Sequence, residues 1–136
     1  MTISLLKFDV ILLQEVKSTQ DQVDSLINRF GYSCLVNVNS EDSNKPGTAL
    51  IWKNFLPVIG AVNLICCRLQ TAQIGPYNIF DCCAPSGSEN RLARIQFYGE
   101  ELFRYLILYP DSSIIIVPTL AVKYLSVYCA LISSST

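Results

Sequence analysis

The stretch "FDVILLQEV", residues 8–16, is the part of the sequence that decides the fold. Its apolar residues are consecutive rather than alternating, which is typical of a strand covered on both faces. Gln14 and Glu15 follow at the carboxyl end, where such a strand meets solvent. We therefore predict a buried strand that presents the Glu15 carboxylate at its end.

An amphipathic helix is predicted for the next segment, "KSTQDQVDSLINRFGY" (17–32). Its apolar residues at helical spacing are Val23, Leu26, Ile27 and Phe30. Ser18 or Thr19 can cap the first turn, and Gly31 can end the helix. A helix with one apolar face is expected to pack on a sheet.

Further apolar segments predict more strands: a half-exposed strand at 33–39, a strand or hairpin at 48–62, and single strands at 63–72 and 77–85. A polar loop separates the first two, because Pro46 and Gly47 break regular structure there. A longer helix is predicted at 88–109, with Ser88 as its N-cap. Its broad apolar face consists of Leu92, Ile95, Phe97, Leu102, Phe103 and Leu106. Strands and helices alternate, with several strands in a row, so the predicted fold class is a layered α/β (α+β) domain.

The C-terminal segment, 112–136, is predicted to begin as a buried strand and to continue as an irregular tail. Its apolar part, 114–132, is almost as long as the roughly 20 residues that cross a bilayer. Lys123 in mid-span would cost about 2.5 to 3.5 kcal/mol on insertion, and Pro118 interrupts the run. A tail anchor is therefore the less favoured interpretation.

Composition narrows the classes of function. Half of the residues are hydrophobic (51%) and 15% are charged, which excludes wholesale disorder. The net charge of −1 provides no long-range attraction to nucleic acid or anionic lipid. The chain contains no histidine, and so lacks the commonest general base near neutral pH and the commonest nitrogen ligand of zinc.

The six cysteines form no Cys-x-x-Cys pair, which argues against a zinc site. Two pairs are adjacent, Cys66–Cys67 and Cys82–Cys83, and adjacent residues of a strand point to opposite faces. We interpret them as small buried hydrophobes of a reduced compartment rather than as a disulfide framework. The N-terminus lacks the pattern of a secretory signal, so we expect an intracellular protein, nuclear or cytoplasmic.

Three blocks of sequence, taken in order, resemble a known family: "FDVILLQEV" (8–16), "KPGTALIWKN" (45–54) and "APSGSENRLARIQFYGEELFRYL" (84–106). They are similar to the endonuclease/exonuclease/phosphatase superfamily, and most similar to the apurinic-endonuclease-like domain of non-LTR (LINE-type) retrotransposons. The resemblance covers roughly residues 8–117 and corresponds to the middle of that domain, so that both ends are expected to be missing. It divides the chain into a partial domain at 1–117 and a divergent apolar tail at 118–136.

The resemblance implies a partial four-layer α/β sandwich and, by descent, a phosphodiesterase that nicks DNA with Mg²⁺ or Mn²⁺. A hard cation on carboxylate oxygens neutralises the phosphate charge in such a reaction. Glu15 stands at the position of the family's metal-binding glutamate. It is the one residue of this chain to which the resemblance assigns a catalytic and metal-ligating role. Without the resemblance, Glu15 would be interpreted as a solvated carboxylate at a strand end.

Several departures from the family pattern predict an inactive chain. The family's Asn-x-Tyr before Ala-Pro-Ser is here Asp81, Cys82 and Cys83, and a thiol is a weaker hydrogen-bond donor than a phenol. The family's first strand does not fit before residue 8, its late histidine is absent, and "IIIVPTLAVKY" (114–124) replaces its Gly-Asp-Phe-Asn-like motif. The loss of one positioned acid–base group typically costs about 10²- to 10⁴-fold in rate.

Two functions remain open. The first is a truncated, inactive LINE-type endonuclease domain whose DNA binding is weak or absent. The alternative is a non-catalytic interaction module that reuses part of the fold and self-associates through exposed sheet edges. The arginines of the long helix, Arg91, Arg94 and Arg104, are interpreted as a solvated face rather than as phosphate contacts, because Glu89, Glu100 and Glu101 are interspersed among them.

Overall fold

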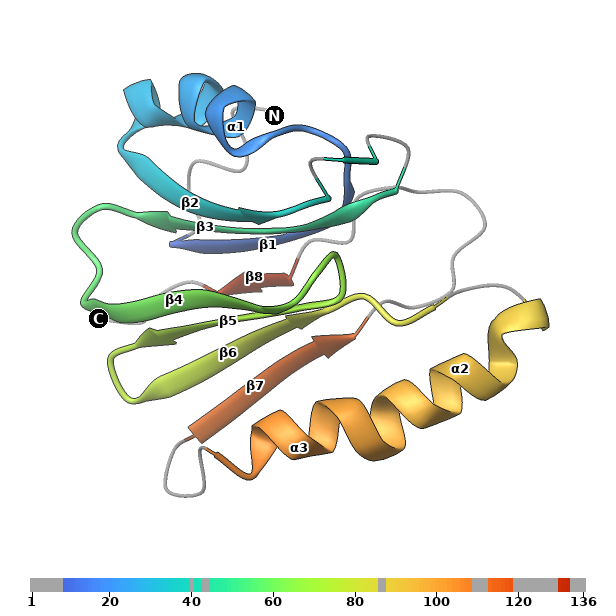
Figure 1. Cartoon of the computed structure of the whole chain (residues 1–136). Helices are drawn as coiled ribbons and strands as arrows, with labels where there is room; N and C mark the ends of the chain where they lie inside the picture. Colours follow the sequence, from blue (N-terminus) through green and yellow to red (C-terminus); the bar gives the residue numbers. More distant parts are fainter. Residues whose placement is uncertain are drawn as a thin grey trace.

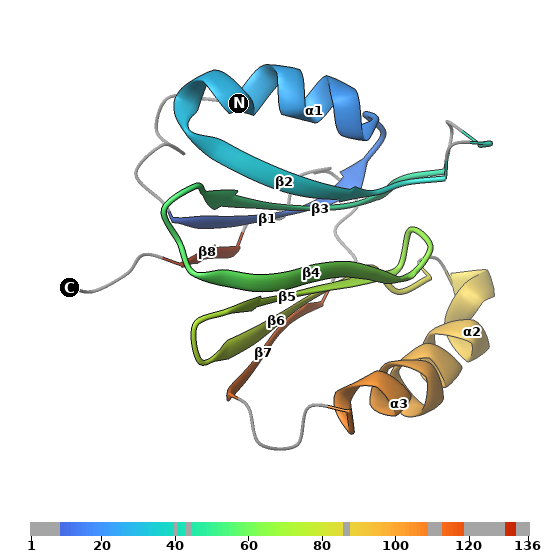
Figure 2. The ribbon, with the colours of Figure 1, turned by 60° about the vertical axis from the view of Figure 1, so that its left-hand side comes forward.

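The computed structural model describes residues 9–39, 41–42, 45–85, 88–108, 113–118 and 130–132. Two four-stranded sheets lie face to face, in the orders β2-β3-β1-β8 and β4-β5-β6-β7. Helix α1 covers the outer face of the first sheet, and α2 with α3 covers the outer face of the second (Figures 1 and 2). The strands are β1 (Val10–Val16), β2 (Tyr32–Asn37), β3 (Gly47–Lys53), β4 (Val58–Ile65), β5 (Leu69–Ile74), β6 (Tyr77–Cys82), β7 (Ser113–Pro118) and β8 (Ala130–Ile132).

Three apolar clusters fill the spaces between the four layers, and β1 contributes to two of them. Val10 and Leu12 face the second sheet, where they join residues such as Ile79. Ile11 faces α1, where it packs in a cluster with Ile27. Strand β1 is therefore covered on both faces, and the predicted layered α/β fold is confirmed.

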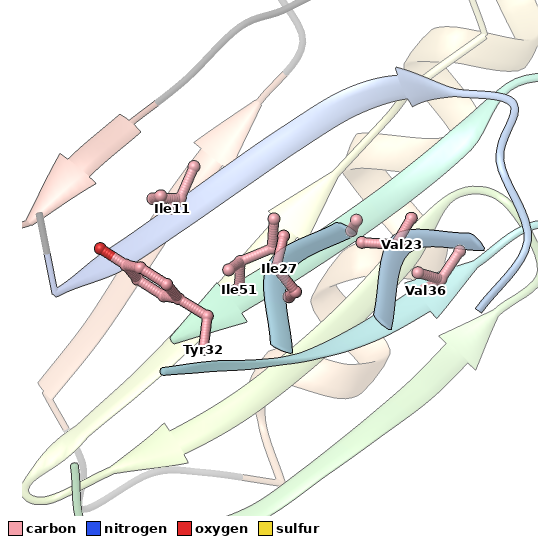
Figure 3. Close-up of a cluster of buried hydrophobic side chains, with 7 residues drawn as sticks. Ile11, Val23, Ile27, Tyr32, Val36 and Ile51 are labelled. Carbon is pink, nitrogen blue, oxygen red and sulfur yellow. The ribbon is translucent and has the colours of Figure 1, made fainter. Parts of the chain in front are cut away.

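Helix α1 (Gln20–Ile27) is anchored by its cap and by its apolar face. Thr19 is the N-cap: its Oγ1 accepts from the Gln22 backbone N (3.3 Å), and the Gln22 side chain accepts from the Thr19 backbone N (2.9 Å). A 3₁₀ turn, Asn28–Phe30, continues the helix to Gly31, whose φ of 80° is accessible to glycine without strain. The cluster that α1 forms with the first sheet includes the residues labelled in Figure 3: Ile11, Val23, Ile27, Tyr32, Val36 and Ile51.

The segments 48–62 and 63–72 differ from the sequence prediction. Strands β3 and β4 belong to different sheets, because the chain turns at Lys53–Leu56 and crosses over, and Pro57 has no N–H with which to continue a ladder. Segment 63–72 is not one strand but the end of β4, a turn and the start of β5, with Ile65 opposite Leu69.

The long helix also departs from the prediction. It begins as a 3₁₀ turn (Ser88–Asn90), so that Asn90 rather than Ser88 is the N-cap of α2 (Arg91–Gln96). A π-helical stretch (Phe97–Glu101) then leads into α3 (Leu102–Leu106). The wider turn rotates the following residues about the axis, so the predicted broad apolar face is divided. Phe97 and Leu102 are buried against the sheet, whereas Leu92, Ile95 and Phe103 are exposed.

The C-terminal segment contributes a strand to each sheet. Strand β7 pairs parallel to β6, in agreement with the predicted strand. Ala130–Ile132, predicted as part of an irregular tail, form β8 and pair antiparallel with Val10–Leu12, because a short apolar run satisfies its backbone on the edge of β1. The rest of the predicted tail lies outside the described residues. Among the residues that the structure describes, no helix has the length and apolarity needed to cross a membrane.

Candidate active site

Glu15 lies at a β-bulge near the carboxyl end of β1. Gln14 pairs with Thr48 and Val16 with Gly47, so Glu15 is the extra residue between them. Its φ is 55°, a left-handed conformation that is uncommon outside glycine and is often found at functional sites. The bulge interrupts the alternation of the strand, and the Glu15 side chain is exposed.

Glu15 borders a pocket of about 160 Å³ to which segments far apart in the sequence contribute. The loop before β3, the turn between β4 and β5, the end of β6 and the start of the long helix meet there. The lining residues are Glu15, Lys45, Pro46, Arg68, Cys83, Ala84 and Asn90. The structure thus brings the predicted site residue Glu15 together with Cys83 in one pocket.

Arg68 is held in the pocket by reciprocal hydrogen bonds. Its Nη1 donates to the backbone oxygen of Cys83 (3.1 Å), and the backbone N of Cys83 donates to the backbone oxygen of Arg68 (2.7 Å). These bonds fix the β4–β5 turn against the end of β6. The pocket therefore contains at least one positioned cation, to which Lys45 adds a second positive charge.

A buried polar contact next to this pocket links the two sheets. Gln14 Nε2 donates to Asp81 Oδ1 (3.0 Å) and to the backbone oxygen of Cys82 (2.9 Å). The Asp81 side chain has no exposed surface, and burial raises its pKa well above the ordinary value although the Gln14 hydrogen bond lowers it. Burial therefore favours the protonated form of Asp81, which lies inside the sandwich and is not among the residues that line the pocket.

A second polar contact between the sheets positions the turn that carries Arg68. Asn37 Nδ2 donates to the backbone oxygens of Ile65 (2.9 Å) and Leu69 (3.1 Å). Its Oδ1 accepts from the backbone N of Cys67 (3.1 Å). One amide from β2 thus satisfies three backbone groups around the β4–β5 turn, which favours a single conformation of that turn.

The pocket's donor set does not fit a divalent cation held by protein ligands. Within the described ranges, no three Asp, Glu, Cys or His side chains lie close enough together to hold a metal ion. Glu15 is the one carboxylate of the pocket, and Lys45 and Arg68 would repel a cation. Magnesium usually takes one or two carboxylates plus substrate oxygens, and the two cations beside Glu15 oppose even the smallest such arrangement.

Sequence reasoning located Glu15 and Cys83 but missed Lys45, Arg68 and Asn90. Arg68 follows a cysteine pair inside a segment predicted to be a strand, and no glycine or asparagine marked the turn. Cys83 is buried, with 6% of its surface exposed, in agreement with its interpretation as a packing residue.

The helix arginines are arranged largely as predicted. Arg91 and Arg104 are exposed. Arg94 is partly buried, and its Nη1 donates to the backbone oxygen of Pro85 (3.1 Å), which ties the helix to the segment after β6. The positions predicted for the missing Gly-Asp-Phe-Asn-like motif lie largely outside the described residues, since only 113–118 and 130–132 are described in that part of the chain.

The arrangement of layers and pocket defines a class of fold. Two stacked sheets with helices on both outer faces form a partial four-layer α/β sandwich of the endonuclease/exonuclease/phosphatase type.

Solved structures of TDP2 have this fold, and the chain is similar to them. A truncated TDP2 of Caenorhabditis elegans matches over 89% of this chain with 18% identity and a TM-score of 0.59. TDP2 of D. rerio, humanised by 14 mutations, matches over 81% with 13% identity and a TM-score of 0.57. A further C. elegans TDP2 structure matches over 85% with 20% identity and a TM-score of 0.55.

These similarities concern the fold. The chain spans 52%, 51% and 38% of the length of these three TDP2 chains, respectively. No protein-family profile and no curated protein matches the sequence.

Proposed function

We propose that this chain retains the scaffold of a LINE-type retrotransposon endonuclease domain without its hydrolytic activity. The fold supports a phosphodiesterase-type ancestor. The resemblance of three sequence blocks favours the retrotransposon subfamily within that fold. The composition of the pocket around Glu15 supports the loss of activity.

One observation carries the proposal: the pocket combines a single carboxylate with two cations. Phosphodiester hydrolysis of this kind needs a cation on carboxylate oxygens, a base that activates water and donors around the charged phosphate. Glu15 can supply one metal ligand and Arg68 one donor. The Cys83 thiol is a poor replacement for a phenolic donor, and neither a histidine nor a second pocket carboxylate is present among the described residues to act as the base.

DNA is the substrate class that the proposal assigns to the ancestor. In the present chain, Lys45 and Arg68 can contact a phosphate, but the net charge of −1 adds no general attraction. We therefore expect DNA binding to be weak and sensitive to salt, because each phosphate contact exchanges with bound counterions.

A plasmid-nicking assay tests the proposal. Supercoiled DNA is incubated with the purified chain and Mg²⁺ or Mn²⁺, beside an EDTA control and the variants Glu15→Ala and Glu100→Ala. Glu100 is an exposed carboxylate of the long helix and serves as the matched control. All three proteins are expected to be folded by circular dichroism and equally inert. Metal-dependent nicking that Glu15→Ala abolishes and Glu100→Ala retains would show that the chain is an active enzyme.

Genomic context tests the retrotransposon origin separately. Reverse-transcriptase coding sequence downstream of this chain supports the proposed origin. An independent single-domain gene argues against it, whatever the result of the nicking assay.

Self-association is a second candidate function, and one feature of the second sheet favours it. Strand β4 stands at the end of that sheet and has β5 as its one neighbouring strand within the described ranges. An edge strand can accept a strand from another chain, here a second copy. Sedimentation velocity across a concentration series tests this role: a mass that rises to that of a dimer supports it, and a constant monomer mass excludes it.

A further inference from the structure

The chain contains two pairs of adjacent cysteines, and the structure holds them in different ways. Cys82 ends β6 and Cys83 follows it, and both are buried. Cys66 and Cys67 lie instead in the turn between β4 and β5, where Cys66 is exposed. Their Sγ atoms are 3.6 Å apart. The prediction that both pairs point to opposite faces of a strand is therefore wrong for Cys66 and Cys67.

The backbone of the turn brings these two sulfur atoms together. Cys67 has a φ of 60°, in the left-handed region that residues with a side chain rarely adopt. This conformation ends the alternation of β4, which would otherwise place adjacent side chains on opposite sides. The Asn37 hydrogen bond to the backbone N of Cys67 and the bond from Arg68 N to Ile65 O (3.0 Å) hold the turn in this form.

We propose that Cys66 and Cys67 form a peroxide-sensitive dithiol that closes to a disulfide within the turn. The Cys66 thiolate attacks one oxygen of a hydroperoxide, so that an S–O bond forms and the O–O bond breaks; Cys66 becomes a sulfenic acid, and the departing alkoxide or hydroxide takes up the proton that Cys66 released on ionising. The Cys67 sulfur then attacks the Cys66 sulfur, the S–S bond forms, and the departing hydroxide takes the Cys67 proton as water. In total, one hydroperoxide takes up two electrons, and the two thiols supply these electrons as they form the disulfide.

Exposure selects Cys66 over the other described cysteines, because Cys67, Cys82 and Cys83 are buried and Cys34 is partly buried. Burial, assisted by a hydrogen bond to Asp24, raises the pKa of Cys34 to about 12, and burial raises that of Cys82 to about 12. Both thiols stay protonated and unreactive near neutral pH. Cys66 faces solvent, and its resolving partner is already within 3.6 Å.

The disulfide is expected to be reversible. Adjacent Cα atoms lie about 3.8 Å apart across a trans peptide, closer than the usual separation of roughly 4.4 to 6.8 Å in disulfides. Such a bond is strained, and strained disulfides are the easily reduced ones. Arg68, the next residue, lines the candidate active site, so the oxidised turn would adjoin that pocket.

Tryptic peptides of the wild-type chain separate the two pairs and provide a built-in control. Cleavage after Lys53 and Arg68 gives peptide 54–68, which contains Cys66, Cys67 and no other cysteine. Cleavage after Arg68 and Arg91 gives peptide 69–91, which contains Cys82 and Cys83. The reduced chain is treated with dilute hydrogen peroxide, unfolded in the presence of iodoacetamide, digested and analysed by mass spectrometry.

Peptide 54–68 is expected to lose two hydrogen atoms and to remain unalkylated, while peptide 69–91 is alkylated at both cysteines. When the chain is oxidised in urea, both cysteine pairs are expected to react alike, because the turn is absent from the unfolded chain. Cys66 recovered as sulfinic acid beside an alkylated Cys67, or a disulfide to another chain, would overturn the proposal. Equal oxidation of both pairs in the folded chain, or selectivity that persists in urea, would overturn it as well.

Discussion

Replacing Asp81 with asparagine is expected to stabilise the chain at neutral pH. The Asp81 side chain is fully buried; its Oδ1 accepts a hydrogen bond from Gln14, and its Oδ2 has no hydrogen-bond partner. Burial raises its pKa well above the ordinary value and so favours the protonated carboxyl group in the folded chain. Asparagine has almost the same shape and never ionises.

The sign of the effect follows from the two pKa values of Asp81. Below the unfolded value of about 3.9, both states are protonated and ionisation contributes nothing. At higher pH the unfolded chain loses the proton while the folded chain keeps it, so the free energy of unfolding falls by about 1.4 kcal/mol per pH unit up to the folded pKa. We therefore expect Asp81→Asn to be more stable than the wild type at neutral pH, by a margin that grows with pH; an amide hydrogen left without a partner reduces this margin by about 1 kcal/mol.

Urea unfolding, followed by the fluorescence of the single tryptophan, Trp52, measures this gain. The advantage of Asp81→Asn should be small near the unfolded pKa and should widen as the pH rises. Asn78→Asp is the matched control, because Asn78 lies on the same strand, is 1% exposed and has no hydrogen bond to either side-chain polar atom. It should lose stability increasingly with pH. A pH-independent difference between Asp81→Asn and the wild type would mean that Asp81 is ionised in the folded chain, which would refute the reasoning.

Three further substitutions test the packing by urea unfolding. Thr19→Ala removes the hydrogen bond from the Gln22 backbone N and should cost about 1 kcal/mol, whereas Thr19→Ser should cost less; equal losses would refute a role for the cap. Gly47→Ala places a methyl group against the backbone oxygen of Asn37 and should cost about 2 kcal/mol or more; an unchanged midpoint would contradict this close approach. Leu92→Ser, at a side chain that is 81% exposed, should change stability by no more than about 0.5 kcal/mol, and a larger loss would show that Leu92 is covered.

Features that depend on neighbouring residues could be predicted from the sequence. The apolar run of β1 and the capped helix α1 were predictable because strand burial, helical spacing and the Thr19 cap are local patterns. The layered α/β class followed from the order of such elements, and Glu15 could be placed at a strand end for the same reason.

Features that depend on contacts between segments far apart in the chain became visible only in the tertiary structure. The turn at Cys66–Arg68 was hidden because no glycine marks it, and an amide from Asn37 on another strand holds its left-handed residue. Arg68 meets Glu15 in one pocket only because the two sheets stack. The pKa of Asp81 is raised because the sandwich removes its carboxyl group from water. Burial and proximity of this kind arise from packing between layers, and local sequence patterns do not encode them.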